Sequence, residues 1–181
     1  DGTPAPVYVI PVGNGPTGVA VSPDGDSAYT ANNYSGSLSV IDTATNTVSA
    51  TVGIGFSPIP VAVNSAGTRV YAGNDYAGTV SVINAATNAV ISTINVGGVS
   101  DTARALAVNP VLDRLYVVDN RNDRIRLVDT SNNTIVGNVS VGEGLLLGSV
   151  GEQAGDELVG EFAESQVDLR LQENEGSGIA G

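Results

Sequence analysis

Residues 16–55 read PTGVAVSPDGDSAYTANNYSGSLSVIDTATNTVSATVGIG, and residues 58–97 read PIPVAVNSAGTRVYAGNDYAGTVSVINAATNAVISTINVG. The two stretches align without a gap at an offset of 42 residues. The residues that recur include Val19, Gly25, Tyr29, Asn32, Tyr34, Gly36 and Val40, which return as Val61, Gly67, Tyr71, Asn74, Tyr76, Gly78 and Val82. Residues 105–142, ALAVNPVLDRLYVVDNRNDRIRLVDTSNNTIVGNVSVG, form a third copy at a further offset of 45 residues. The chain is therefore built on an internal repeat.

Each repeat contains four short runs rich in Val, Ile, Thr and Tyr, which in the first copy fall at about 18–22, 28–32, 38–42 and 47–52. The sequence Ser-Pro-Asp-Gly at residues 22–25 separates the first two runs. It predicts a tight turn, because proline fixes φ and glycine accepts backbone conformations that other residues avoid. A period in the low forties with four strands predicts a β-propeller blade, a four-stranded sheet that packs on both faces. The predicted fold class is all-β.

The repeat resembles the YVTN family of β-propeller repeats. The likeness is carried by AYTAN at 28–32, VYAGN at 70–74 and LYVVD at 115–119, and by SVIDTATN at 39–46, SVINAATN at 81–88 and RLVDTSNN at 126–133. It covers roughly residues 7–144 and implies an exported or surface-layer-like prokaryotic protein. We expect three complete blades, at about 16–57, 58–99 and 100–144. The run at residues 7–12 resembles the last strand of a preceding blade, so we expect an incomplete propeller or one completed in an assembly.

Residues 145–181 break the period. All seven glutamates of the chain lie at or beyond Glu143, and Arg170 is the one basic residue in this stretch. The segment is predicted to be either an acidic tail unrelated to the repeat or a diverged part of a further blade. We expect it to pack differently from the three blades.

The composition excludes several kinds of chemistry. The chain has no Cys and no His, so it has no disulfide, thiolate nucleophile, imidazole base or histidine metal ligand, and neither a cofactor nor a metal is expected. A net charge of −12 argues against nucleic acid as a partner, and no apolar run is long enough to span a membrane. The chain also lacks Met, so Asp1 is not a translation start. A removed secretory signal and a cloned fragment both fit, and the first favours an extracellular, cell-surface or periplasmic location.

Two sets of loops are expected to share one rim of the propeller: those between the second and third strands, and those between blades. The first set carries Asn33, Tyr34, Asp75, Tyr76, Asn120 and Arg121, and the second carries Phe56 and Arg104. Tyrosine offers apolar area with a hydrogen-bonding tip and arginine offers planar donors, so this rim is the predicted site for protein or glycan. The binding candidates are Tyr34, Tyr76, Arg121, Phe56 and Arg104. The alternative is that Tyr34 and Tyr76 recur because every repeat needs the same loop packing.

Two groups of charged and amide residues receive structural interpretations. Asp42, Asp129 and nearby asparagines are expected to cap turns rather than bind calcium, because they lack the alternating spacing of a calcium loop. In the third copy, charges of both signs are expected to pair with one another on a solvated edge. These are Asp119, Arg121, Asp123, Arg124, Arg126 and Asp129.

The function expected from these features is a non-catalytic interaction or scaffolding module. Some propeller lactonases and lyases resemble this repeat, which makes an enzyme the first alternative. It is not the main expectation, because their functional His and Glu positions have no match in the three copies. A structural extracellular polymer joined through open blade edges is the second. Because closed propellers have about four to eight blades, the outer faces of three blades need a cover, and we expect self-association or a completing partner chain.

Overall fold

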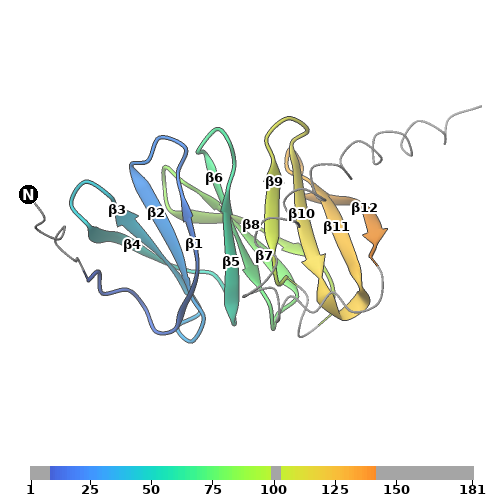
Figure 1. Ribbon diagram of the computed structural model, residues 1–181, viewed down its shortest axis with the longest axis horizontal. Helices are drawn as coiled ribbons and strands as arrows, with labels where there is room; N and C mark the ends of the chain where they lie inside the picture. Colours follow the sequence, from blue (N-terminus) through green and yellow to red (C-terminus); the bar gives the residue numbers. More distant parts are fainter. Residues whose placement is uncertain (1–8, 99–102, 142–181) are drawn as a thin grey trace, which may run out of the picture. The chain divides into compact units, whose positions relative to one another are not determined.

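The computed structural model describes residues 9–98 and 103–141. They fold into three four-stranded antiparallel sheets that belong to one compact unit, Asp1–Leu145 (Figure 1). In each sheet the order of the strands in space is their order in the chain. Blade 1 holds β1 (Pro16–Val21), β2 (Ser27–Asn32), β3 (Ser37–Asp42) and β4 (Thr47–Gly53). Blade 2 holds β5 (Pro58–Val63), β6 (Arg69–Asn74), β7 (Thr79–Asn84) and β8 (Ala89–Asn95). Blade 3 holds β9 (Leu106–Asn109), β10 (Arg114–Asp119), β11 (Arg124–Asp129) and β12 (Thr134–Ser140).

The two middle strands of each blade are the buried ones. In β3 every residue except Asp42 is buried, whereas β4 alternates between exposed and half-buried positions over most of its length. Because side chains of a strand point alternately to its two faces, burial of both sets means that the sheet is covered on both sides. The all-β propeller-blade fold predicted from the repeat is confirmed.

The cores lie between neighbouring blades. Tyr29, Leu38, Val40 and Val52 of blade 1 pack against Val70, Ala72 and Ile83 of blade 2. On its opposite face, blade 2 packs against blade 3; this second core contains Tyr71, Val80, Val82, Ile94, Leu115, Val117 and Val128. Each four-stranded sheet therefore contributes one face to one core and the opposite face to the next.

The first strands of blades 1 and 2 lie side by side (Figure 1). The Thr17 hydroxyl donates to the carbonyl oxygens of Pro58 and Ile59, at 3.1 and 3.3 Å. A methyl group added at Gly18 would lie 2.2 Å from the Ile59 carbonyl oxygen, far inside the contact distance. Glycine at this position lets the two backbones approach closely.

The turns follow the sequence. The predicted turn at residues 22–25 forms, with the Gly25 N–H donating to the Ser22 carbonyl at 2.9 Å and Gly25 at φ 81°. The third turn of each blade places an asparagine in the left-handed region, with φ of 55° at Asn46, 55° at Asn88 and 60° at Asn133. Asparagine is one of the few residues with a side chain that adopts this conformation readily.

The sequence did not show an irregularity that all three blades share. The pairing of the third strand with the fourth shifts register once in each blade, after Val40, Val82 and Leu127. These three residues are equivalent under the repeat offsets, so the bulge belongs to the repeat. A bulge adds one residue to one strand and increases its twist.

Part of the sequence interpretation falls outside these sheets. Of the predicted orphan strand at residues 7–12, the described residues 9–12 join no sheet. The strand prediction is therefore wrong over residues 9–12, which pair with no strand among the described residues. The predicted boundary near residue 145 and the segment after it lie outside the described residues. Within 9–98 and 103–141, no helix has the length and apolar character needed to cross a membrane.

Candidate functional site

Three segments of the predicted rim lie together at one end of blades 1 and 2. The Asn33 side-chain amide, in the β2–β3 loop, donates to the Ser57 hydroxyl at 2.9 Å and to the Pro58 carbonyl at 3.3 Å. The backbone N–H of Asp75, in the β6–β7 loop, donates to the Ser57 carbonyl at 3.1 Å. The connection between the blades, which carries Phe56, is therefore fixed between the two tyrosine-bearing loops.

Backbone hydrogen bonds hold these loops in the same way in each blade. The Ile54 N–H donates to the Gly36 carbonyl at 3.0 Å, and the Val96 N–H donates to the Gly78 carbonyl at 2.9 Å. In blade 3 the Val141 N–H donates to the Asp123 carbonyl at 2.9 Å. The same backbone hydrogen bond therefore recurs in all three blades, with tyrosine in the loops of blades 1 and 2 and arginine in that of blade 3.

The aromatic side chains of the rim are largely exposed. Tyr34 is 85% exposed, Phe56 78% and Tyr76 61%, whereas Tyr29 and Tyr71 are buried in the blade cores. We call Tyr34, Phe56 and Tyr76 the aromatic rim. Exposed aromatic side chains on a fixed backbone are typical of surfaces that bind another molecule.

The alternative reading, that these tyrosines serve loop packing, has partial support at Tyr34. A Cβ placed on Gly15 would lie 2.7 Å from the Tyr34 ring, so the ring lies against the Gly15 backbone. Gly15 has φ 65°, and the equivalent Ser57 in blade 2 has φ 54°. A left-handed serine is a strained choice, so the loop conformation is conserved between the blades even where the residue is not glycine. Packing thus accounts for where the Tyr34 ring lies, and most of its surface stays exposed.

The two arginine candidates are placed differently. Arg104 forms an ion pair with Asp75, with 3.3 Å between Nε and Oδ1, so it joins the β6–β7 loop to the connection into blade 3. Arg121 lies exposed in the 3-10 turn Asn120–Asn122, at the blade 3 position that corresponds to Tyr34 and Tyr76. The rim therefore changes from aromatic on blades 1 and 2 to cationic on blade 3.

Sequence reasoning misplaced one charged cluster. Asp119 pairs with Arg124 at 2.7 Å and with Arg126 at 3.5 Å, so mutual pairing is confirmed for these three of the six residues. The expected solvated edge is wrong, because the Asp119 side chain is 0% exposed. Strand pairing puts these three side chains on the face that carries Leu115 and Val117, which packs against blade 2.

The same three positions in the other blades hold an uncharged cluster. The Asn32 amide donates to the hydroxyls of Ser37 and Ser39, and the Asn74 amide donates to those of Thr79 and Ser81, at 2.9–3.1 Å. In the sequence, Asp119 aligns with Asn74, which is buried in blade 2. This alignment was the feature of the sequence that could have indicated the burial of Asp119.

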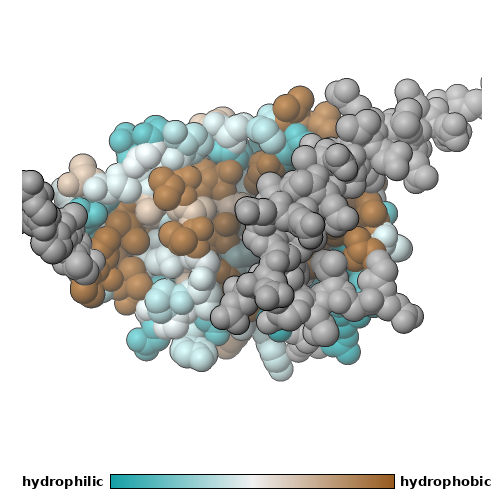
Figure 2. Space-filling model, viewed as in Figure 1, coloured by the Kyte–Doolittle hydropathy of each residue, from teal (hydrophilic) through white to brown (hydrophobic). Residues whose placement is uncertain are grey.

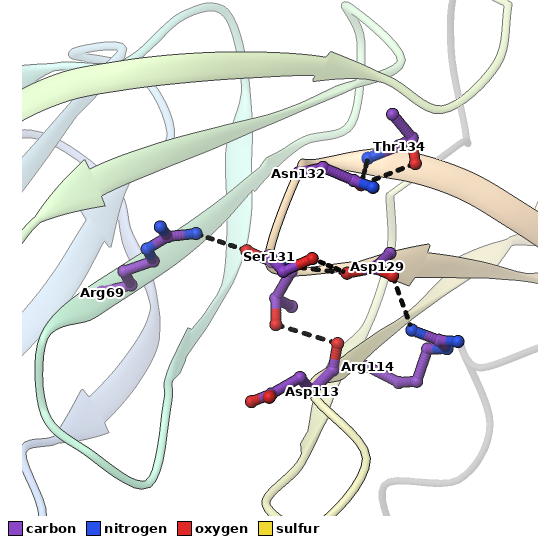
Figure 3. Close-up of polar contacts among 8 residues, drawn as sticks. Arg69, Asp113, Arg114, Asp129, Ser131, Asn132 and Thr134 are labelled. Atoms are coloured by element: carbon purple, nitrogen blue, oxygen red, sulfur yellow. Dashed lines mark hydrogen bonds and ion pairs between the residues drawn. The ribbon is translucent and has the colours of Figure 1, made fainter.

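At the opposite end of the blades, polar side chains cap the turns. Asp42 accepts hydrogen bonds from the Thr45 N–H and hydroxyl, and these bonds lower the pKa of its carboxyl group below the ordinary value. Asp129 accepts from the Ser131 hydroxyl and N–H, which lower its pKa, and it also pairs with Arg114 at 3.0 Å (Figure 3). The turn-capping prediction for Asp42 and Asp129 is confirmed.

A link between blades 2 and 3 lies beside these caps. Arg69 of β6 donates to the Thr130 carbonyl, and the Thr130 hydroxyl donates to the Asp113 carbonyl at 2.9 Å (Figure 3). Asp42 and Asp129 at this end therefore stabilise turns, and Arg69 joins blades 2 and 3.

A shallow cavity of about 330 Å³, which the sequence did not suggest, lies between the turns of blades 1 and 2 at this same end. Its one carboxylate, Asp24, accepts a hydrogen bond from the Ser22 hydroxyl, which lowers its pKa. The lining residues are Ser22, Asp24, Ser27, Tyr29, Gly67, Thr68, Asn84, Ala85 and Ala86. Within the described residues, no three carboxylates come together as metal ligands.

Comparisons with known proteins place the fold. No family model matches the sequence, and no curated protein matches it. Among solved structures, hydrazine synthase of Kuenenia stuttgartiensis superposes with a TM-score of 0.67 at 24% identity, covering 78% of this chain and 40% of that one. U3-55K gives 0.65 at 15% identity, with 72% and 40% covered. The WD40 repeats of RRP9 give 0.63 at 16% identity, with 71% and 39% covered. The similar structures are of the propeller and WD40 type, and this chain spans about two fifths of their length.

Proposed function

We propose that this chain is a non-catalytic interaction module that binds a protein partner through the aromatic rim, outside the cell or at its surface. The observation that carries the proposal is the exposure of Tyr34, Phe56 and Tyr76 on loops that hydrogen bonds tie together. Aromatic side chains on a pre-ordered backbone give a large contact area with little loss of conformational entropy. The propeller and WD40 neighbours are consistent with a scaffold.

Two features of the sequence support the extracellular location and the absence of catalysis, and a third bears on the kind of ligand. The resemblance to YVTN repeats favours an exported protein, and the lack of His and Cys restricts catalysis to carboxylate, hydroxyl or cofactor chemistry. The rim also mixes aromatic rings with the amide of Asn33 and the hydroxyl of Ser57, groups that bind sugars as well as peptides. A glycan is therefore the second candidate ligand. Detection of the chain in the surface or medium fraction of its source cells tests the location.

The enzyme alternative has one similar structure behind it, hydrazine synthase, whose likeness at 24% identity extends to the fold. If the chain is an enzyme, it should show saturable turnover that a single Asp or Glu substitution abolishes. Hydrolysis of a lactone or ester panel above the buffer rate, lost in such a variant, would replace the interaction proposal with a catalytic one.

The direct test compares two variants on arrays of defined extracellular proteins and oligosaccharides. The rim variant combines Tyr34→Ala, Phe56→Ala and Tyr76→Ala. The control combines Val111→Ala and Leu112→Ala, which remove exposed apolar side chains from the β9–β10 turn at the other end of the blades. We expect the rim variant to raise the Kd of any array ligand by roughly tenfold or more, and the control to leave it unchanged.

Three outcomes would contradict the proposal. They are no binding on either array, equal binding by the parent and the rim variant, or equal loss in both variants. Binding confined to the oligosaccharides would make the glycan the ligand in place of a protein.

A further inference from the structure

The cavity between blades 1 and 2 lies where the next junction, between blades 2 and 3, holds an arginine. Under the repeat offsets Ser27 aligns with Arg69, and Ala85 aligns with Thr130. Arg69 reaches from blade 2 to blade 3 and donates to the Thr130 carbonyl oxygen (Figure 3). Ser27 and Ala85 both line the cavity, and the serine side chain is too short to make the equivalent contact. The cavity of about 330 Å³ therefore corresponds to space that an arginine occupies one junction further on.

The earlier blade of each junction holds this position by the same backbone hydrogen bond. In blade 1 the Ser22 N–H donates to the Ser27 carbonyl at 2.8 Å. In blade 2 the Asn64 N–H donates to the Arg69 carbonyl at 3.0 Å. Because the two backbones are alike here, the difference between the junctions lies in the side chain.

The later blade of each junction is also built alike. The Ala85 N–H donates to the Thr68 carbonyl at 3.0 Å, which joins the β7–β8 turn to the β5–β6 turn. The Thr130 N–H donates to the Asp113 carbonyl at 2.9 Å, which joins the equivalent turns of blade 3. The Ala85 carbonyl oxygen is therefore the counterpart of the oxygen that Arg69 binds.

The cavity also has a negative charge that the next junction lacks. Asp24, which lines the cavity, stands at the position of Ala66 in blade 2. Its carboxylate accepts hydrogen bonds from the Ser22 hydroxyl and the Asp26 N–H, and these bonds lower its pKa. None of the residues that line the cavity is basic. In Figure 2, hydrophilic residues follow the border of the molecule formed by these turns, above the hydrophobic residues that gather over β1 and β5.

We propose that this cavity binds the guanidinium group of an arginine side chain that a partner protein supplies. The group donates to the Ala85 carbonyl, as Arg69 does to Thr130, and pairs with the Asp24 carboxylate. Guanidinium offers planar donors that match a carboxylate and that remain charged at every physiological pH.

The shape of the cavity favours a protruding side chain over a free small molecule. Small-molecule pockets are concave and mostly apolar, whereas this cavity is shallow and is lined largely by polar and small residues. It lies at the end of the blades opposite the aromatic rim, so the inference does not depend on what the rim binds.

The first experiment titrates a blocked arginine into the complete, isotopically labelled chain and follows the backbone amide resonances by NMR. N-acetyl-arginine methylamide should shift the resonances of Ser27 and Ala85 saturably and leave those of Tyr34 and Tyr76 in place. The matched citrulline compound has nearly the same shape without the charge. It should bind about tenfold more weakly or less, because hydrogen bonds to charged groups are the stronger ones.

Three variants locate the site. Asp24→Asn keeps an oxygen that can accept from Ser22 and removes the charge, so it should raise the Kd of the arginine compound by about tenfold or more. Asp26→Asn removes a neighbouring exposed carboxylate that does not line the cavity, and it should bind like the parent. Ser27→Arg should fill the cavity from within, by the contact that Arg69 makes, and abolish binding.

A fourth variant tests whether the two junctions are equivalent. Arg69→Ser combined with Ala66→Asp should open a cavity between blades 2 and 3 and give it a carboxylate. The arginine compound should then also shift the Thr130 resonance. Circular dichroism checks that each variant is folded, and the Asp24 and Ser27 variants decide the matter if this one unfolds.

Several results would overturn the proposal. They are the absence of a saturable shift, equal binding of the citrulline compound, equal effects of Asp24→Asn and Asp26→Asn, or undiminished binding by Ser27→Arg. A folded Arg69→Ser/Ala66→Asp variant without a second site would contradict the equivalence of the junctions. Tighter binding of free arginine than of the blocked compound would make the amino acid the ligand in place of a partner's side chain.

Discussion

Asp119, Arg124 and Arg126 show how a buried position constrains its neighbours. An asparagine amide at this site donates to two hydroxyls, as Asn74 does to Thr79 and Ser81. An ionised aspartate only accepts hydrogen bonds, so its neighbours must be donors, and in blade 3 both have become arginine. Asp119, Arg124 and Arg126 therefore form one group, which can be replaced by the Asn, Thr and Ser of blade 2 only when all three residues change together.

Asp119→Asn is expected to lower the free energy of unfolding by about 3 kcal/mol, the lower end of the usual cost of breaking a buried ion pair. The loss arises because Arg124 and Arg126 keep their charges but lose the carboxylate, and it is moderated because both guanidinium groups are partly exposed. Urea denaturation followed by circular dichroism measures it.

Two further variants make the measurement specific. Asp123→Asn, in the adjoining turn at φ 46°, should change stability little because asparagine accepts the left-handed conformation equally well. The triple change Asp119→Asn, Arg124→Thr and Arg126→Ser rebuilds the blade 2 group and should recover most of the loss. A triple variant as unstable as Asp119→Asn alone would show that the group is not exchangeable.

The sequence predicted the pairing of these charges but not their burial. Mixed charges in a short stretch usually lie at the surface, and that tendency outweighed the evidence of the alignment with Asn74. The aromatic rim was the reverse case. Its residues were predicted from loop position alone, and the structure brings their loops together, whereas their binding role stays a prediction.

Among the structural elements, the turn between the third and fourth strands is the most regular part of the blade. Asp42, Asn84 and Asp129 occupy the same position at the end of the third strand, and the side-chain oxygen of each accepts from the backbone N–H two or three residues later. A side chain that caps its own turn fixes where the strand ends and so sets the register of the next strand.

The turn cap makes a pH-dependent contribution that Asp42→Asn should remove. Hydrogen bonds from Thr45 lower the pKa of Asp42, so the folded state favours the carboxylate. That stabilisation is complete above the ordinary carboxyl pKa, near pH 4, and is lost as the pH falls through the lowered value. The Asn variant keeps the cap in the form that Asn84 shows, without a titrating group.

Thermal melts between about pH 5 and pH 2 test this prediction at the acid side of the carboxyl pKa. The parent Tm should fall more steeply than that of Asp42→Asn, and the two should differ least when Asp42 is protonated in both states. Parallel curves over the whole range would mean that the Thr45 bonds do not distinguish the two protonation states.

Most strand boundaries were predictable to within a residue or two, because the repeat provides three independent views of each strand. The repeated bulge after Val40, Val82 and Leu127 was not, since a bulge leaves the hydrophobic alternation nearly intact over so short a strand. The predicted strand at residues 7–12 reflected similarity to β4 alone, and residues 9–12 pair with none of the described strands.

At the scale of the whole molecule, the contact between β1 and β5 determines how closely blades 1 and 2 approach each other. Gly18→Ala is expected to destabilise the protein by roughly 1–3 kcal/mol, as overpacking of a close contact does. The added methyl group would lie 2.2 Å from the Ile59 carbonyl oxygen, and backbone on both sides must move to accept it. The hydrogen bonds from Thr17 to Pro58 and Ile59 should weaken as the strands separate.

Gly53→Ala is the matched control at the end of β4, where an added methyl group meets nothing within 4 Å. It should be neutral or slightly stabilising, because alanine has fewer unfolded conformations to lose. Urea denaturation of both variants gives the comparison, and equal effects would show that the blade contact at Gly18 does not cause the loss of stability.

Chain order and spatial order coincide in every sheet, and this has a kinetic consequence. Each hairpin closes over a short loop, so the contact order within a blade is low, and pairing within a blade is fast compared with sheets whose strands are distant in sequence. On the ribosome, blade 1 can pair all four strands once residue 53 has emerged. Its core with blade 2 must wait for Ile83 in β7. Nascent blade 1 therefore waits through the synthesis of some thirty residues before its face toward blade 2 is packed, and the apolar side chains of that face favour aggregation during the interval.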